Sequence, residues 1–177
     1  MRLKPLEARY SRLHNACLAA VATGMIAVAV AHFIAEPANA PTLSVNDPRF
    51  VLFLMLAGSL VYFAWLGVSR FNNRDAQLVI DRDGILLGFG RGKRLAWDDI
   101  AWVRLQRLAF RPQLQIGIVP EVFIAANLGL SMFNLDDSLR PVKGMPAAVL
   151  VRDNGLDTKA SVMLDAVKSF RPNLVRS

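Results

Sequence analysis

Two long runs without a charged side chain place the strongest constraint on how this chain folds. The first covers residues 16–35 and the second covers residues 50–69, and each is 20 residues long. A helix of that length is about 30 Å long, which matches the hydrocarbon thickness of a bilayer. A buried helix of a soluble protein normally carries a polar stripe over such a length. The two runs therefore predict two transmembrane helices with these bounds.

The first run has a second interpretation, a cleaved signal peptide, because basic residues precede it and the A-x-A sequence Ala38-Asn39-Ala40 follows it. However, the apolar core of a signal peptide is usually only about 7–15 residues long. Pro41 also occupies the position after the cleavage site, where it is expected to hinder cleavage. We therefore expect the first run to remain as an uncleaved anchor.

The distribution of basic residues predicts the orientation of the two spans. Residues 1–15 carry four Arg or Lys, Arg70 and Arg74 follow the second span directly, and the connector 36–49 carries only Arg49 beside two acidic residues. Loops that carry more Arg and Lys lie on the cytoplasmic side. We expect 1–15 to be a cytoplasmic N-terminal segment, 36–49 an extracytoplasmic connector, and both termini cytoplasmic.

Small residues four positions apart line the first run, and small residues allow helices to approach closely in lipid. They predict a transmembrane hairpin with the second run, and a contact between two copies of the chain is the alternative. The two ridges are Ala16, Ala20 and Gly24, followed by Ala27, Ala31 and Ala35.

Residues 70–177 are an ordinary length for one domain. Apolar runs at 76–80 and 85–89 flank Asp81-Arg82-Asp83-Gly84, a turn sequence in which Gly84 can adopt a positive φ, so these residues predict a β-hairpin. A glycine-rich turn then leads to a longer strand over 100–110. This part of the chain therefore begins as an antiparallel sheet.

Further strands are expected at 114–118, ended by Pro120, and at 147–151. Residues 122–133 fit either a strand or a short helix, and the polar stretch 134–144 predicts a loop. A C-terminal amphipathic helix follows, with Asp157 or Thr158 as its N-cap and Arg171-Pro172 at its end. Short strands followed by one such helix define an α+β plan. The apolar face of the helix carries Ala160, Met163, Val167 and Phe170.

The order of the first segments is a strand, a turn with glycine, a second strand and an apolar-x-Trp-x-x-Ile sequence. It is carried by Leu78-Val79-Ile80-Asp81-x-x-Gly84-Ile85 and Leu95-Ala96-Trp97-Asp98-Asp99-Ile100. This order resembles bacterial pleckstrin-homology-like (PH-like) domains, in a type of small bacterial protein where two membrane spans precede the domain. Gly144-Met145-Pro146 and Leu156 are also similar to that family, whereas residues 119–143 depart from its pattern. The resemblance implies a strongly bent antiparallel sheet or partial barrel, capped at one end by the C-terminal helix.

Few residues are suited to catalysis or metal binding. The only cysteine, Cys17, lies in the first apolar run, and His14 and His32 are the only histidines, so we expect no nucleophile–base pair and no multi-cysteine site. The stretch 88–94 lacks the spacing and the Ser/Thr of a P-loop and predicts a turn. Asp98-Asp99 is expected to form turn or cap bonds beside Trp97. We expect no catalytic residue, no cofactor and no metal.

The net charge of +7 raises the question of an anionic partner. We expect no nucleic acid, because topology explains much of the charge and no recognition helix is apparent. The short link between the second span and the first strand instead places the domain against the cytoplasmic leaflet, where each basic side chain gains about 1 kcal/mol from anionic headgroups. A solvated charged turn is the alternative for residues 90–94. The candidate lipid contacts are Arg70, Arg74, Arg91, Lys93 and Arg94.

Together, these features predict a non-enzymatic, two-pass protein of the bacterial inner membrane that presents a PH-like interaction or assembly domain to the cytoplasm. Its expected partners are the lipid bilayer, with its anionic headgroups, and an unidentified protein, a second copy included. The alternatives are an accessory subunit of a membrane transporter or enzyme complex, and an anionic-lipid-binding module. An independent enzyme would require a pocket with convergent polar groups.

Overall fold

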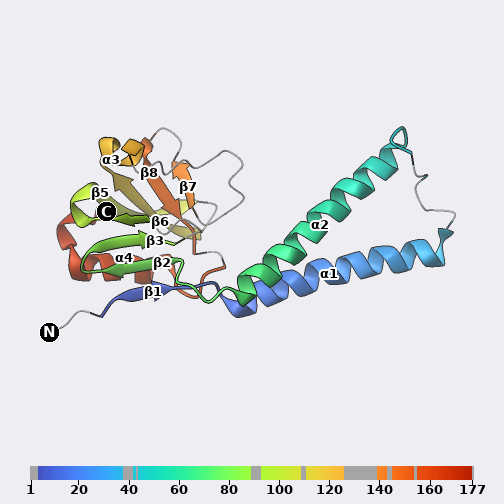
Figure 1. The fold of residues 1–177 in the computed structure, drawn as a ribbon, viewed down its shortest axis with the longest axis horizontal. Helices are drawn as coiled ribbons and strands as arrows, with labels where there is room; N and C mark the ends of the chain where they lie inside the picture. Colours follow the sequence, from blue (N-terminus) through green and yellow to red (C-terminus); the bar gives the residue numbers. More distant parts are fainter. Residues whose placement is uncertain are drawn as a thin grey trace. The chain divides into compact units, whose positions relative to one another are not determined.

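The computed structural model describes residues 4–37, 42, 44–88, 93–108, 111–125, 139–142, 145–153 and 155–176. The chain divides into a helical unit, Ser11–Asn73, and a sheet unit made of Met1–Tyr10 and Arg74–Ser177. Figure 1 shows the helices of the first unit and the sheets of the second. The sheet unit is therefore assembled from two stretches of sequence that flank the helical unit.

The helical unit contains α1 (Arg12–Ala35) and α2 (Pro48–Asn72). The side chain of Ser11 caps α1 by accepting the N–H of His14, and that of Asp47 caps α2 by accepting the N–H of Arg49. Both helices are long and apolar enough to cross a membrane. A long apolar helix over each of the two runs is thus confirmed, whereas membrane insertion stays a prediction.

The two helices pack in antiparallel fashion along residues spaced alternately by three and four, the spacing of a coiled-coil seam. The rings of Phe33 and Phe53 meet edge to face at 5.1 Å near one end. The ridges expected on α1 do not form this seam, since Ala20 and Gly24 are exposed. The seam residues are Asn15, Ala19, Ala22, Ile26, Ala29 and Phe33 of α1 and Phe53, Ala57, Leu60, Ala64 and Gly67 of α2.

The first sheet of the sheet unit confirms the predicted hairpin. At its turn Gly84 has a φ of +136°, and the Asp81 carboxylate accepts the N–H of Asp83 at 2.9 Å. All the strand pairs in this sheet are antiparallel, in the order β1-β2-β3-β4. The strands are β1 (Leu6–Ala8), β2 (Leu78–Asp81), β3 (Gly84–Leu87) and β4 (Lys93–Leu95).

Strand β1 was not expected from the sequence. It precedes α1 in the chain but pairs with β2 (Figure 1). The register of the pair sets Leu6 opposite Ile80. Ala8 is fully buried in the core of the sheet unit. The segment continues into a reciprocal pair of bonds, in which the N–H of Arg9 donates to the Asp157 carboxylate and the N–H of Asp157 donates to the carbonyl of Arg9. Residues before the first helix are therefore an integral part of the sheet unit.

The second sheet has the order β5-β6-β8-β7 and is also antiparallel. The strands expected at 114–118 and 147–151 are confirmed. The loop expected at 134–144 is wrong in part, because β7 occupies residues 139–142. Pro141 argues against a strand, but β7 is an edge strand, where a missing N–H is tolerated. The strands are β5 (Ile100–Leu108), β6 (Arg111–Ile118), β7 (Leu139–Val142) and β8 (Met145–Val151).

Helix α3 (Pro120–Ala125) decides the first part of the ambiguous 122–133 stretch in favour of a helix, and the rest of that stretch lies outside the described residues. A short 3-10 turn, η2 (Trp97–Asp99), precedes β5, and the Asp99 carboxylate accepts the N–H of Ala96 there, as expected.

The C-terminal helix α4 (Ala160–Phe170) is confirmed, but its cap is not Asp157 or Thr158. The helix is preceded by Lys159, and the Asp153 carboxylate accepts the N–H of Ala160. Asp157 is occupied by its bonds to Arg9. A 3-10 turn, η3 (Pro172–Leu174), follows the helix.

One hydrophobic core joins both sheets to α4, and α4 contacts β2, β5 and β6. The indole of Trp97 stacks on Phe170 and donates to the carbonyls of Asp81 and Arg82, so it fastens the β2–β3 turn to the end of α4. The α+β plan is confirmed. The described strands form two separate sheets and no closed barrel. The fully buried core side chains include Leu78, Ile80, Ile85, Leu95, Val103, Ile116, Val149, Met163 and Val167.

Candidate functional site

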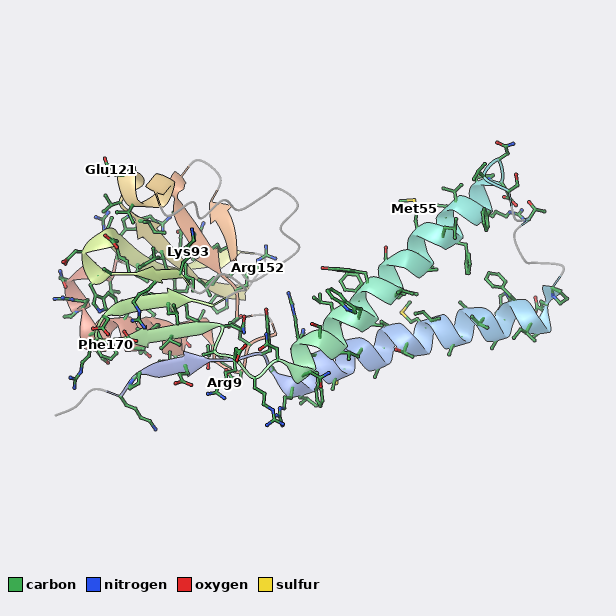
Figure 2. The ribbon with its side chains drawn as sticks, viewed as in Figure 1. Arg9, Met55, Lys93, Glu121, Arg152 and Phe170 are labelled. Atoms are coloured by element: carbon green, nitrogen blue, oxygen red, sulfur yellow. The ribbon has the colours of Figure 1, made fainter. Side chains whose placement is uncertain are left out.

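The five basic residues predicted to contact lipid lie in different parts of the structure. Arg70 is in the last turn of α2 and belongs to the helical unit, while Arg74 is exposed just before β2 in the sheet unit. Lys93 and Arg94 lie on β4, at the edge of the first sheet, and Figure 2 labels Lys93. Arg91 lies outside the described residues.

Arg94 is engaged by an acidic partner within its own sheet. Its guanidinium Nη1 lies 2.6 Å from Oδ1 of Asp81, across the β2–β3–β4 ladder. This hydrogen bond lowers the pKa of the Asp81 carboxyl and raises that of the Arg94 guanidinium. The pair neutralises part of the charge that Lys93 and Arg94 offer to a headgroup. Lipid contact by these five residues stays a prediction.

A different cluster of polar side chains, which the sequence analysis did not single out, lies on the second sheet. Alternate residues of β5 and β6 point away from the core: Trp102 is opposite Gly117, Arg104 is opposite Gln115, and Gln106 is opposite Gln113. Their neighbours in the strands, such as Val103 and Ile116, are fully buried in the core. We call the surface formed by Trp102, Arg104, Gln106, Gln113, Gln115, Gly117 and Arg152 the polar face.

The side chain of Arg104 is held in place on the polar face by two contacts. Its Nε donates to Oε1 of Gln115 at 2.6 Å, and its guanidinium carbon lies 5.0 Å from the centre of the Trp102 ring. The indole in turn lies directly over Gly117, where any Cβ would collide with the ring. The guanidinium is therefore pre-oriented by a stacked indole and a buried amide.

Two buried polar atoms of the polar face have no hydrogen-bond partner among the described residues. They are Oε1 of Gln113, whose residue is 7% exposed, and Nε of Arg152, which follows β8 (Figure 2). The ladder pairs Leu114 with Val151, so Gln113 and Arg152 take the next opposite positions. Unsatisfied buried polar atoms are uncommon because each costs about 1–3 kcal/mol.

The sequence did contain a signal for this face. Segments 100–118 and 139–152, which contain all the strands of the second sheet, hold six Arg or Lys residues and no Asp or Glu. Polar residues alternate with apolar ones in β5 and β6. Such alternation ordinarily marks a solvated face, and only the structure shows that Gln113 and Gln115 are buried on it.

Among the described residues there is no group of three or more His, Cys, Asp or Glu side chains that could hold a metal ion. Comparison of the chain with protein-family models, with curated proteins and with solved structures gives no match.

Proposed function

We propose that this chain is a non-enzymatic, two-pass protein of the bacterial inner membrane, whose sheet unit is a PH-like interaction or assembly domain on the cytoplasmic side. The proposal combines the membrane topology inferred from charge with the resemblance carried by residues 78–100 and 144–170. Two antiparallel sheets and a C-terminal helix that packs on both are compatible with that resemblance.

The pairing of β1 with β2 is the observation that carries the topology. β1 precedes α1, β2 follows α2, and their backbones form one ladder from Leu6–Ile80 to Ala8–Leu78. A ladder cannot form across a bilayer, so both segments must lie on the same side of any membrane that the helices enter. Only an even number of crossings satisfies this condition, which supports a two-pass chain with an uncleaved first helix.

The surface of the helical unit supports insertion into lipid. Large apolar side chains are exposed on both helices, among them Val28 at 70%, Ile34 at 76% and Leu52 at 66%. A water-facing surface of this kind would favour association or aggregation. A bilayer gives these side chains an apolar surrounding and leaves the backbone bonds satisfied within each helix.

Accessibility of single cysteines tests the topology in the intact protein. Starting from Cys17→Ser, one variant carries Asn46→Cys in the connector and a second carries Asp83→Cys in the exposed β2–β3 turn. A membrane-impermeant maleimide should label the first variant in intact spheroplasts and the second only after lysis. Labelling of Asp83→Cys from outside, or release of the chain by alkaline carbonate, would contradict the proposal.

The interaction role is tested by purification of the intact chain in mild detergent, followed by identification of stoichiometric partners. A stable transporter or enzyme complex that contains the chain would favour the accessory-subunit alternative. A fragment of residues 75–177 is unsuitable for such tests, because it lacks β1 and exposes the edge of β2.

A further inference from the structure

The polar face of the second sheet has the chemistry of an anion site. Arg104 and Arg152 supply two cationic groups, and neither has a carboxylate partner among the described residues. The strands around them contain no acidic residue, and the carboxylate of Asp153, which follows Arg152 in the chain, is used to accept the N–H of Ala160. An excess of basic groups creates a positive potential, which raises the local concentration of anions.

We propose that the polar face binds a phosphate group at Arg152 and Gln113, with Arg104, which lies two strands away on the same face, as the second cation. A planar guanidinium offers a fork of N–H donors that matches the oxygens of phosphate. Nε of Arg104 is already used by Gln115, and this bond and the Trp102 ring fix the plane in which the remaining nitrogens lie. Two arginines suit the double charge of a phosphate better than the single charge of a carboxylate.

Gln113 and Arg152 provide the second, independent observation. Nε of Arg152 is a buried donor and Oε1 of Gln113 is a buried acceptor, and both lack a partner among the described residues. A phosphate oxygen would satisfy the arginine, and either a phosphate hydroxyl or a rotated amide would satisfy Gln113. Arg104, Trp102 and Arg152 are only half-buried, so a ligand can reach them from solvent.

The site is distinct from the basic residues considered for lipid contact. Arg94 lies on β4, rather than in the turn that the sequence predicted, and is paired with Asp81 in the first sheet. Arg104 and Arg152 belong to the second sheet. The phosphate has two possible sources, a soluble phosphate compound or the headgroup of an anionic lipid. Both present the same oxygens to the arginines, so the experiment has one arm for each.

Thermal unfolding of the intact protein in nanodiscs tests the site. In the first arm the discs contain phosphatidylcholine, and inorganic phosphate is titrated against chloride at constant ionic strength. In the second arm phosphatidylglycerol replaces part of the lipid and phosphate is omitted. Ligand binding to the folded state raises Tm. In a Trp65→Phe background, the near-ultraviolet circular dichroism of the remaining tryptophans, Trp97 and Trp102, reports the sheet unit.

The rise in Tm is compared between the original protein and three variants. Arg104→Gln and Arg152→Gln each remove one cation from the site, and Arg82→Gln removes the same charge from an exposed turn of the first sheet. Loss of one charge-assisted bond should weaken phosphate binding about tenfold or more. Arg82→Gln should respond like the original protein. Arg152→Gln should keep or raise the Tm of the protein without ligand, because it removes a buried donor, Nε, that has no partner among the described residues.

A phosphate-dependent rise in Tm that Arg152→Gln weakens supports a site for soluble phosphate. A rise in Tm that occurs only in phosphatidylglycerol discs and is lost in Arg152→Gln assigns the phosphate to lipid. An equal response in all variants would show a general salt effect and would overturn the proposal. No response in either arm would also overturn it and would leave water as the partner of the buried atoms.

Discussion

The close approach of α1 and α2 at Gly67 gives a quantitative prediction for the substitution Gly67→Ala. A Cβ at this position would lie 2.8 Å from the backbone nitrogen of Ala19 and from the carbonyl oxygen of Asn15, whereas ordinary Cβ contacts begin at 3.4 Å. Both atoms are backbone atoms, so no side-chain rotation relieves the contact. The helices must separate locally by about 0.6 Å, the difference between these two distances.

Adding one carbon to a packed interface costs about 1–3 kcal/mol. Replacing glycine with alanine inside a helix also stabilises the helix by about 0.5–1 kcal/mol, so two effects of opposite sign combine at Gly67. Gly24 and Gly58 separate these effects, because a Cβ on either meets nothing within 4 Å. The free energy of unfolding of Gly67→Ala should therefore lie about 1–3 kcal/mol below those of Gly24→Ala and Gly58→Ala.

The measurement is unfolding of the intact protein in neutral detergent micelles by titration with sodium dodecyl sulfate, followed by far-ultraviolet circular dichroism. The midpoint for Gly67→Ala should fall at a lower mole fraction of dodecyl sulfate than the midpoints of both control variants. If all three midpoints coincide, the helices do not pack closely at Gly67 and the reasoning from the seam is refuted.

Three further predictions concern the sheet unit. Gly84→Ala should lower the free energy of unfolding by about 1–3 kcal/mol, because φ is +136° there; chemical denaturation that shows no loss would contradict the turn geometry. The pKa of Asp81 is lowered by its bond to Arg94, so the ionised carboxylate stabilises the folded state above the unfolded pKa of 3.8, and this stabilisation is lost as pH falls through the lower folded pKa. Asp81→Asn should therefore flatten the curve of unfolding free energy against pH in this acidic range. Parallel curves for the variant and the original protein would argue against the pair. Ala8→Asp buries a carboxylate in the core and should lower the free energy of unfolding by at least about 2 kcal/mol. Glu7→Gln, on the exposed side of β1, should not. Equal Tm values for these two variants would show that β1 is not part of the core.

The sequence predicted the features that depend on local patterns. An absence of charge over 20 residues was sufficient to locate both helices, and the Gly84 turn was sufficient to locate the β2–β3 hairpin. β1 escaped detection because three residues carry no periodicity and their partner strand begins about seventy residues later. β7 escaped because Pro141 is unfavourable in a strand unless the strand is at an edge, and edges are a property of the whole sheet.

The packing of the helices and the polar face needed information that local patterns lack. Counting small residues every four positions selected Ala20 and Gly24, whereas the seam follows alternate steps of three and four through Asn15, Ala19 and Ala22. The alternation of polar and apolar residues in β5 and β6 indicates which side chains face away from the core, but it does not indicate that Gln113 is buried. Burial of a polar strand face depends on residues from distant segments.

The position of β1 has a consequence for biosynthesis. The strand leaves the ribosome first, yet its partner Ile80 is made only after both helices are complete. Closing such a long loop carries an entropic cost, which the antiparallel helix pair reduces because it brings the two ends of the loop together. In a two-pass chain, failure of the second helix to insert would leave β1 and β2 on opposite sides of the bilayer. The edge of β2 would then stay open, so completion of the first sheet reports that the hairpin was correctly inserted.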